Sequence, residues 1–212
     1  MSEAKSAESR PYHHGDLRRA LVDAARRLLE ARGPSALSLR AVAREAGVSP
    51  AAPYHHFKDK AELLDAVAHE GWEMLQLAMI DAKSKSQGLQ QLTALGIAYV
   101  CFARDNPALY RVMYDAARDK EALPMDVEDA NPENGNAYCM VRDTMIEHGA
   151  DPTAETHLEL ATVAAWCGAH GLAEMAGFKQ FDHLKAELGG ERQFLDAVFN
   201  HMGLFPKAHH DC

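Results

Sequence analysis

Hydrophobic residues recur along this chain at the three- and four-residue spacing of α-helices. No useful stretch alternates with the period of two that is typical of strands. Leu17, Leu21, Ala24 and Leu28 fall on one face of a first helix, which Gly33-Pro34 ends. The pattern therefore predicts an all-α protein.

Helix-capping residues predict two short helices after the first one. Ser38 is a good N-cap for a helix from Leu39 to Ala46, and Gly47 supplies a tight turn. Ser49 is predicted to cap the next segment, with Pro50 at the first helical position, where proline is favoured.

The segment "SPAAPYHHF" is the least regular part of this region. Pro53 still lies within a first helical turn, where it forfeits at most one hydrogen bond, so residues 50–57 are predicted to be a short helix. Asp59 is predicted to cap a long helix that begins near Lys60.

The remaining pattern predicts a helical body of about nine helices in total. Residues 119–135, "DKEALPMDVEDANPENG", are acidic and contain two prolines, which indicates a long loop. Further helices are expected at about 88–104, 107–118, 136–148, 154–177 and 190–203.

Charge divides the chain into two unlike parts. Residues 1–60 hold 11 Lys and Arg against 7 Asp and Glu, a net charge of +4, whereas residues 61–212 hold 11 against 24, a net charge of −13. Such asymmetry indicates that the basic head alone meets an anionic partner.

The sequence gives no sign of export or of a membrane span. The N-terminus, "MSEAKSAESRP", has no apolar core of a signal peptide, and the longest apolar run, 160–173, is too short to cross a bilayer. We therefore expect a cytoplasmic protein with no membrane partner. The four cysteines form no C-x-x-C pair and are expected to be free thiols.

No metal site or cofactor is expected. His55 and His56 are adjacent, so on a helix they would point about 100° apart, which suits a single ion poorly. The tail from His209 to Cys212 has metal-capable side chains, but a terminal extension is the simpler interpretation.

The two short helices and the glycine turn form a helix-turn-helix pattern, which is typical of DNA binding. Ala51 and Ala52 would keep the reading end slim enough for the major groove. Tyr54, His55 and His56 offer hydroxyl and imidazole donors to phosphates.

This region resembles the TetR family of transcriptional regulators over "SLRAVAREAGVSPAAPYHHFKDKAELL", residues 38–64. The resemblance implies an all-α homodimer on a palindromic operator. It implies that Tyr54, His56 and Lys60 contact phosphates, that Ser49, Ala51 and Ala52 lie at base edges, and that Phe57 is a core aromatic. The candidate DNA-binding residues are Ser38, Arg40, Ser49, Pro50, Ala51, Ala52, Tyr54, His55, His56 and Lys60.

Two alternatives remain open for this region. Tyr54 could be a core residue instead of a phosphate contact. The arginines of the first helix could form an ordinary solvated face.

A second stretch, "HLELATVAAWCGAHGLAEMAGF", is apolar nearly all round, so both faces of its helix are expected to be buried. Trp166, His170 and Gly171 resemble a TetR subgroup named for a Trp-His-Gly C-terminal domain, and "YVCFARDNPALYRVMY", 99–114, fits the same subgroup. Aromatic and methionine side chains suit an apolar ligand. The pocket candidates are Tyr99, Phe102, Tyr110, Met113, Met140, Met145, Trp166 and His170.

The alternative is that these side chains are packed core residues, with His170 paired to Glu174. A small-residue face on this helix and an apolar stripe on the last helix predict a dimer interface, since a stripe of that size is rarely exposed on a monomer. The resemblance implies that the last two long helices pair between subunits. The interface candidates are Ala161, Ala165, Gly168, Leu172, Phe194, Leu195, Val198, Phe199 and Met202.

The domain assignment that follows is a flexible arm at 1–12, a helix-turn-helix domain at 13–60, a ligand-binding and dimerisation domain at 61–208 and a tail at 209–212. The predicted function is a DNA-binding repressor that a small apolar effector releases. The alternatives are a small-molecule binder or adaptor that does not bind DNA, and an enzyme using His170 with Glu159 or Glu174 as an acid–base pair. No nucleophile motif, phosphate loop or metal spacing favours the enzyme.

Overall fold

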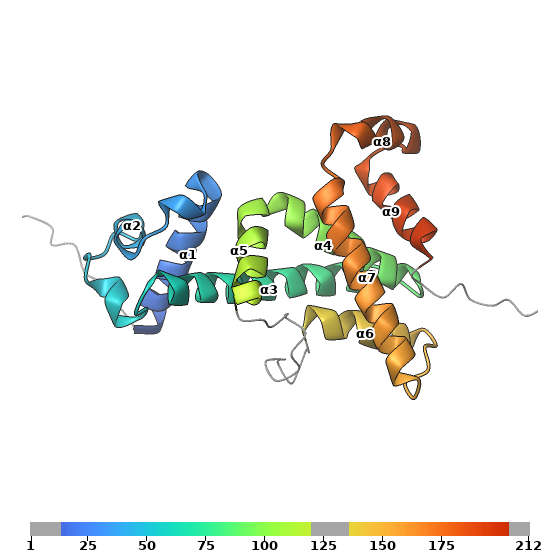
Figure 1. The fold of residues 1–212 in the computed structure, drawn as a ribbon, viewed down its shortest axis with the longest axis horizontal. Coiled ribbons are helices and arrows are strands. Elements are labelled where there is room, and N and C mark those ends of the chain that lie inside the picture. Colours follow the sequence, from blue (N-terminus) through green and yellow to red (C-terminus); the bar gives the residue numbers. More distant parts are fainter. Residues whose placement is uncertain (1–13, 120–135, 204–212) are drawn as a thin grey trace, which may run out of the picture. The chain divides into compact units, whose positions relative to one another are not determined.

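The structure, a computed structural model, describes residues 14–119 and 136–203 (Figure 1). Within these two stretches every regular element is helical, which confirms the all-α prediction. The helices are α1 (His14–Arg32), α2 (Leu39–Glu45), α3 (Lys60–Ser84), α4 (Gln90–Asp105), α5 (Pro107–Asp119), α6 (Ala137–Glu147), α7 (Glu155–Met175), α8 (Asp182–Leu188) and α9 (Glu191–Met202), with short 3₁₀ helices at Pro34–Ala36, Ala52–His55 and Lys179–Phe181.

The chain divides into two compact units between Val67 and Ala68, inside α3. The predicted boundary at residue 60 lies instead where this helix begins. The expected arm, the tail and nearly all of the predicted loop at 119–135 fall outside the described residues.

The first unit, the head, contains α1, α2 and the start of α3. Its core is built from the predicted face of α1, with Leu21, Ala24 and Leu28 all buried, and from Phe57, which is 1% exposed. Burying such side chains contributes on the order of 2 kcal/mol each, so the head has an apolar core of its own.

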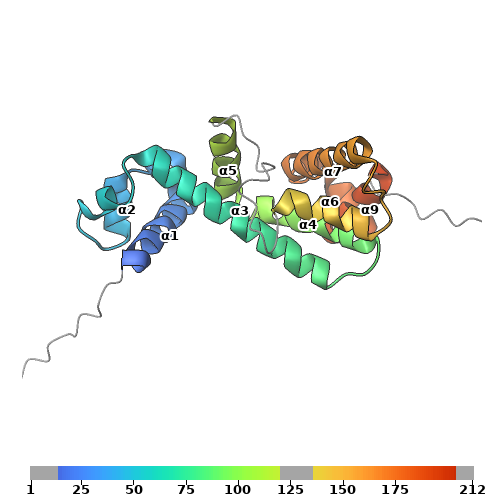
Figure 2. The ribbon, with the colours of Figure 1, turned by 90° about the horizontal axis from the view of Figure 1, so that it is seen from below.

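The second unit, the body, is organised on α4, which contacts α5, α6, α7 and α9. Figure 2 shows α4, α6, α7 and α9 gathered together. Close packing is clearest at Gly96 of α4, where a Cβ atom would lie 2.5 Å from Cζ of Phe199 on α9. The absence of a side chain at Gly96 lets α9 lie directly on α4.

Two element predictions were wrong. Residues 50–57 do not form an α-helix: only Ala52–His55 is helical, and it is a 3₁₀ turn, because Pro53 cannot donate the hydrogen bond of an α-helix. The second miss is α8, whose seven residues are too few to show a clear period. None of the described helices is long and apolar enough to cross a membrane.

Candidate nucleic-acid interface and ligand cavity

The turn of the helix-turn-helix is fixed by backbone hydrogen bonds after α2. Gly47 has a φ of 70°, the left-handed conformation that glycine adopts without a Cβ penalty. Val48 N donates to Ala43 O at 2.9 Å, and Gly47 N donates to Arg44 O at 3.2 Å, the two bonds of a Schellman motif. At the other end of α2, the Ser38 hydroxyl oxygen accepts from Ala41 N at 3.1 Å, which confirms Ser38 as the N-cap.

Pro53 holds the segment after the turn in place. The Pro53 carbonyl accepts hydrogen bonds from His56 N at 3.0 Å and Phe57 N at 2.9 Å, and the Pro53 and Phe57 side chains are buried. Tyr54 is 53% exposed, which excludes the alternative that it is a core residue. The predicted cap by the Ser49 side chain is wrong, because the 3₁₀ turn starts after Ala51 and has no side-chain cap.

Two reciprocal hydrogen bonds between side chains and backbone cap the start of α3. Asp59 Oδ1 accepts from Glu62 N at 3.0 Å, and Glu62 Oε2 accepts from Lys58 N at 2.8 Å, so the predicted Asp59 cap is confirmed. Lys60 Nζ donates to Pro34 O at 3.0 Å. Lys60 is thereby held beside the loop that follows α1.

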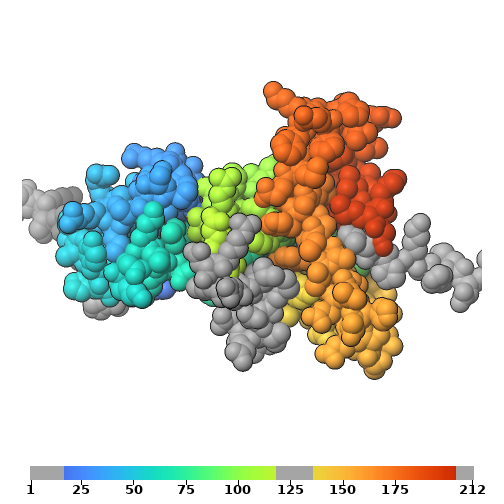
Figure 3. All heavy atoms as spheres, in the orientation of Figure 1, coloured from blue at the N-terminus to red at the C-terminus, as the bar shows by residue number. Residues whose placement is uncertain are grey.

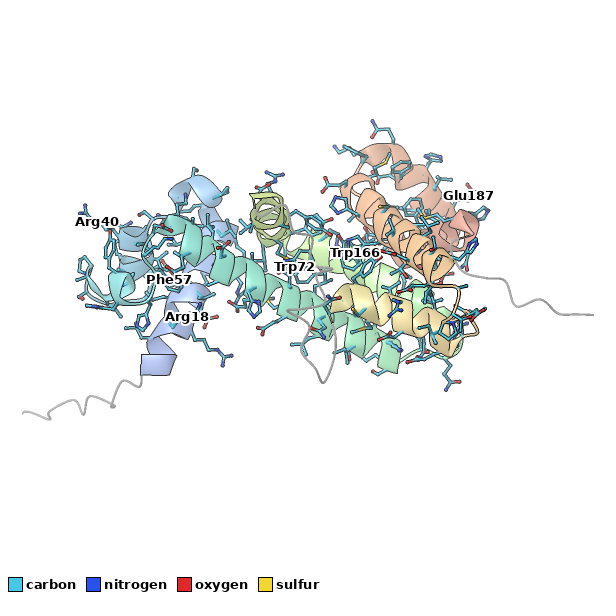
Figure 4. The ribbon with its side chains drawn as sticks, turned by 60° about the horizontal axis from the view of Figure 1, so that its bottom comes forward. Arg18, Arg40, Phe57, Trp72, Trp166 and Glu187 are labelled. Atoms are coloured by element: carbon cyan, nitrogen blue, oxygen red, sulfur yellow. The ribbon has the colours of Figure 1, made fainter. Side chains whose placement is uncertain are left out.

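The candidate DNA-binding residues lie mostly on the surface of the head, and Figure 4 labels Arg40 among them. An exposed donor can reach a phosphate without a change in the fold. Ser38, Arg40, Ser49, Pro50, Ala51, Tyr54, His55 and Lys60 are exposed, and Ala52 and His56 are partly buried.

Two arginines of α1 make contacts within the head. The Arg18 guanidinium carbon lies 5.3 Å from the ring centroid of Phe57, a cation–π contact, and Figure 4 labels both residues. Arg27 Nε lies 3.5 Å from Glu45 Oε1 on α2. These contacts stabilise the head itself. The alternative that the arginines form only a solvated face therefore does not hold for Arg18 and Arg27.

A cavity of about 580 Å³ lies in the body, a size that suits a small organic ligand. Its lining combines aromatic rings, small apolar side chains and charged groups from α4, α5, α7 and the start of α9. The lining residues are Val100, Ala103, Arg104, Pro107, Tyr110, Arg111, Tyr114, Asp115, His170, Ala173, Glu174, Ala176, Gly177 and Glu191.

Three tyrosines and a histidine from three helices form a hydrogen-bonded cluster at this cavity. The Tyr99 hydroxyl lies 3.1 Å from the Tyr110 hydroxyl and 3.1 Å from His170 Nδ1, and it also contacts the Tyr114 hydroxyl. Tyr110 reaches His170 Nδ1 at 2.5 Å. The Trp166 ring packs edge-on against Tyr99, with ring centroids 5.2 Å apart.

Burial keeps these hydroxyls protonated. Removal from water raises the pKa of Tyr99 and Tyr110 above the usual value, and raises the pKa of Tyr114 to about 12. At neutral pH each tyrosine therefore brings one hydrogen to the cluster.

Only two of the eight predicted pocket residues, Tyr110 and His170, line this cavity. Tyr99 and Trp166 line a second cavity of only about 20 Å³. Tyr114 was missed, although its spacing of four residues from Tyr110 on one helix could have indicated it. The other four candidates are buried core residues, as the alternative interpretation predicted: Phe102, Met113, Met140 and Met145.

The apolar stripe on α9 was predicted to be a dimer interface because it was expected to be exposed on a single chain. That expectation was wrong. Phe194, Leu195 and Phe199 are at most 3% exposed within this one chain. The ring of Phe194 stacks on Phe181 at 5.8 Å, and Phe199 packs on Gly96. In this stripe only Met202, at the end of the helix, is exposed, at 37%, and Val198 is partly buried.

The predicted small-residue face of α7 is also corrected. Ala165 and Leu172 are buried, and Ala161 and Gly168 are partly buried, because this face turns toward the rest of the body. The prediction that both faces are buried was wrong. A neighbouring stripe on α7, the helix drawn in orange in Figure 3, is exposed and apolar. Its residues are Leu160, Ala164, Cys167, Gly171 and Met175.

No group of three or more His, Cys, Asp or Glu side chains in the described part of the chain is placed to hold a metal ion. The tail from His209 to Cys212 lies outside that part.

Comparison with known proteins decides between the classes that the geometry allows. Residues 21–67 match the family described as bacterial regulatory proteins, tetR family, and residues 92–198 match the tetracyclin repressor-like C-terminal domain. The chain belongs to the TetR family. TetR proteins are transcription regulators and not enzymes, so the acid–base alternative for His170 is excluded. The Trp-His-Gly subgroup stays a prediction.

Individual relatives agree with this assignment. An uncharacterized HTH-type transcriptional regulator of Bacillus subtilis (strain 168), YobS, is 28% identical over 137 residues, which span 64% of this chain and 66%, just under two thirds, of that protein. A solved structure of a protein of unknown function from Rhodococcus sp. RHA1 has a TM-score of 0.70 at 28% identity, covering 93% of this chain and 98% of that one. A TetR family regulator from Marinobacter aquaeolei VT8 shares the fold at 18% identity, with a TM-score of 0.55 over 89% of this chain and 94% of its own.

Proposed function

We propose that this TetR-family regulator is a cytoplasmic repressor that binds a palindromic operator as a homodimer and is released by a small molecule. The observation that carries the proposal is the pairing, in one chain, of a folded helix-turn-helix whose reading segment is exposed with a body that holds a ligand-sized cavity. The charge division between a head of +4 and a remainder of −13 supports DNA contact by the head alone.

We assign DNA contacts to the exposed surface of the reading segment. Ala51 presents only a methyl group, which leaves room for a close approach to base edges. Tyr54 and His55 expose donors that suit phosphate oxygens, and Lys60 adds a cation at the start of α3. Pro53 serves this surface from inside, by holding the turn against Phe57.

The exposed stripe of α7 is the dimer face that we propose in place of the one predicted from the sequence. Its members follow one another at spacings of three and four residues, so they lie on one side of the helix. Leu160 is 62% exposed and Met175 is 50% exposed, which leaves apolar surface that a second copy would cover. The small residues between them would allow a close approach of the two helices.

Ligand control would follow by population shift. A ligand that binds one conformation of the body better than another favours that conformation. In a dimer whose heads must match half-sites about one turn of DNA apart, a change in head spacing weakens operator binding.

A gel-shift titration of the protein against its own promoter DNA, with and without extracts of small metabolites, tests this function. We expect sequence-selective binding that competitor DNA of random sequence does not abolish. Absence of selective binding in every ligand state would favour the alternative of a small-molecule binder or adaptor.

A further inference from the structure

The hydroxyls of Tyr110 and Tyr114 are engaged behind the wall of the cavity. Both contact the hydroxyl of Tyr99, at 3.1 Å in the case of Tyr110. Tyr99 is only 1% exposed and lies outside the lining of this cavity. Because their hydroxyls are turned toward Tyr99, Tyr110 and Tyr114 offer the cavity mainly the carbon surface of their rings.

Three aromatic rings lie together in the cavity lining. The Tyr110 and Tyr114 ring centroids are 5.0 Å apart, and the His170 centroid lies 5.7 Å from the first and 4.5 Å from the second. The face of a tyrosine ring is electron-rich and attracts a cation that lies within about 6 Å of its centroid. Because the rings are this close together, one cationic group can approach more than one of them.

Carboxylates outnumber arginines in the cavity lining. Arg104 is held between two carboxylates, with Nη1 2.6 Å from Glu191 Oε2 and Nη2 2.8 Å from Asp105 Oδ1. The other charged residues of the lining are one arginine and two carboxylates: Arg111, Asp115 and Glu174. The lining therefore carries three carboxylates against two arginines, an excess that disfavours an anionic ligand.

Glu174 brings its negative charge to the aromatic rings. It follows His170 by four residues on α7, so the two side chains lie on the same face of that helix. Burial raises the pKa of the Tyr110 hydroxyl most, and the charge of Glu174 raises it further. Tyr110 belongs to α5, so the charge of Glu174 acts across the cavity lining from α7 to α5.

We propose that the cavity takes an organic cation, a molecule with an alkylated ammonium head on an apolar body. The head would lie against the rings of Tyr110 and Tyr114 with the Glu174 carboxylate nearby, an arrangement of the kind by which aromatic side chains recognise quaternary ammonium groups. Small apolar side chains such as Val100 and Ala103 would receive the body of the ligand. This inference rests on the proposed ligand-responsive function, and it replaces the purely apolar effector that the sequence predicted.

Calorimetry with three compounds that differ in charge tests the proposal. The probes are phenyltrimethylammonium, tert-butylbenzene and benzenesulfonate, which share a phenyl ring and carry a cationic, a neutral or an anionic tetrahedral group. A merely apolar cavity would prefer the neutral compound, because taking an ion out of water is costly. We expect the cation to bind the full-length protein at least about fivefold more tightly than either other probe, a ratio that corresponds to about 1 kcal/mol. A cation that binds no better than either of the other compounds, or not at all, would overturn the proposal.

A charge variant tests the part played by Glu174. Glu174→Gln should lower the affinity for phenyltrimethylammonium by about twofold to fivefold, the range for a partly exposed charge pair, and leave the affinity for tert-butylbenzene unchanged. Glu159→Gln is the matched control, because Glu159 is exposed on the same helix but lies outside the cavity lining. Equal effects of the two variants would show that the net charge of the protein, and not the cavity, attracts the cation.

A ring variant tests the aromatic contact. Tyr110→Leu should lower the ratio of cation affinity to neutral affinity by about threefold, because a general loss of packing weakens both probes alike. Tyr138→Leu is the control, since the Tyr138 ring packs on Trp166 at 5.8 Å and lies outside the cavity lining. An unchanged ratio in Tyr110→Leu would contradict the contact between ring and cation.

Operator binding in gel shifts tests the regulator function separately from the ligand assignment. A protein that binds its operator but prefers the neutral probe would refute only the proposed organic cation. A protein that prefers the cation but binds no operator would refute the regulator function and leave the cavity assignment standing.

Discussion

Lys60, at the start of α3, has one partner in the structure, the Pro34 carbonyl, and a second that we propose, a DNA phosphate. In the structure its ammonium group donates to the Pro34 carbonyl, while the side chain as a whole remains exposed. A flexible lysine stem can turn from a carbonyl to a phosphate at little cost. The same residue could therefore support the free head and contact bound DNA.

We expect Lys60→Ala to lower the salt dependence of operator binding. The slope of log K against log[salt] should fall by about 0.9 for each subunit, the value for one phosphate contact. Fluorescence anisotropy with labelled operator DNA at several salt concentrations measures it. Lys58→Ala is the control, since that side chain is 81% exposed and lies 4.0 Å from Asp59. An unchanged slope would leave Lys60 only the role of holding Pro34.

The buried tyrosines predict a loss of stability in alkali. The unfolded chain releases the Tyr114 proton near pH 10, whereas the folded protein retains it until about pH 12. Stability from this group is complete below pH 10 and is lost as the pH rises through 12, by about 3 kcal/mol for a shift of two pKa units. Urea unfolding between pH 8 and 11 should show a shallower decline in Tyr114→Phe than in the natural protein, with Tyr54→Phe, at an exposed site, as the control.

At the scale of single residues, the sequence predicted local contacts but not contacts between helices. Ser38 and Asp59 were predicted correctly as caps, because a cap depends on neighbours three residues away. Tyr99, Tyr110 and His170 were grouped as pocket candidates, but the hydrogen bonds that join them from three helices could not be predicted. Spacing along the chain carries no information about such a meeting.

The proposed dimer face on α7 can be tested by mutation. Leu160→Arg places a charge on the proposed dimer face and should shift the protein from dimer to monomer in sedimentation experiments, while leaving the body folded. Leu77→Arg is the matched control on α3, because Leu77 is 65% exposed against 62% for Leu160. Equal behaviour of the two variants would remove α7 from the interface.

Cross-linking provides a second test of the same helix. Cys167 is exposed on the α7 stripe, whereas Cys101 and Cys139 are partly buried. In a variant with serine at 101, 139 and 212, a short bis-maleimide should join two subunits through Cys167. A dimer in solution that resists cross-linking would place the interface elsewhere.

The dimer stripe on α9 was assigned wrongly for a physical reason. An amphipathic stripe shows that a helix face is buried, but it cannot show whether the same chain or a partner covers it. The α9 stripe was therefore assigned to a dimer, although α4 and Phe181 cover it. The long helix α7 was predicted within two residues of both its bounds, and α3 begins at the predicted Lys60, because many turns repeat the same signal.

For the whole molecule, the proposed coupling between cavity and operator is reciprocal. If a ligand weakens operator binding by some factor, the operator must weaken ligand binding by the same factor, typically about 5-fold to 150-fold. Calorimetric titration of a compound that binds the cavity, into free protein and into protein saturated with operator DNA, measures this. Equal affinities in the two titrations would show that the cavity does not control DNA binding.

The packing of Trp72 on Trp166 has a practical consequence. The chain has only these two tryptophans, and their rings lie 6.5 Å apart beside Tyr114, at the tyrosine cluster. Figure 4 labels both. Intrinsic tryptophan fluorescence of the intact protein thus originates entirely at this one place. A library of compounds can be screened by emission alone, without a dye, and a change in that emission reports on the body and not on the head.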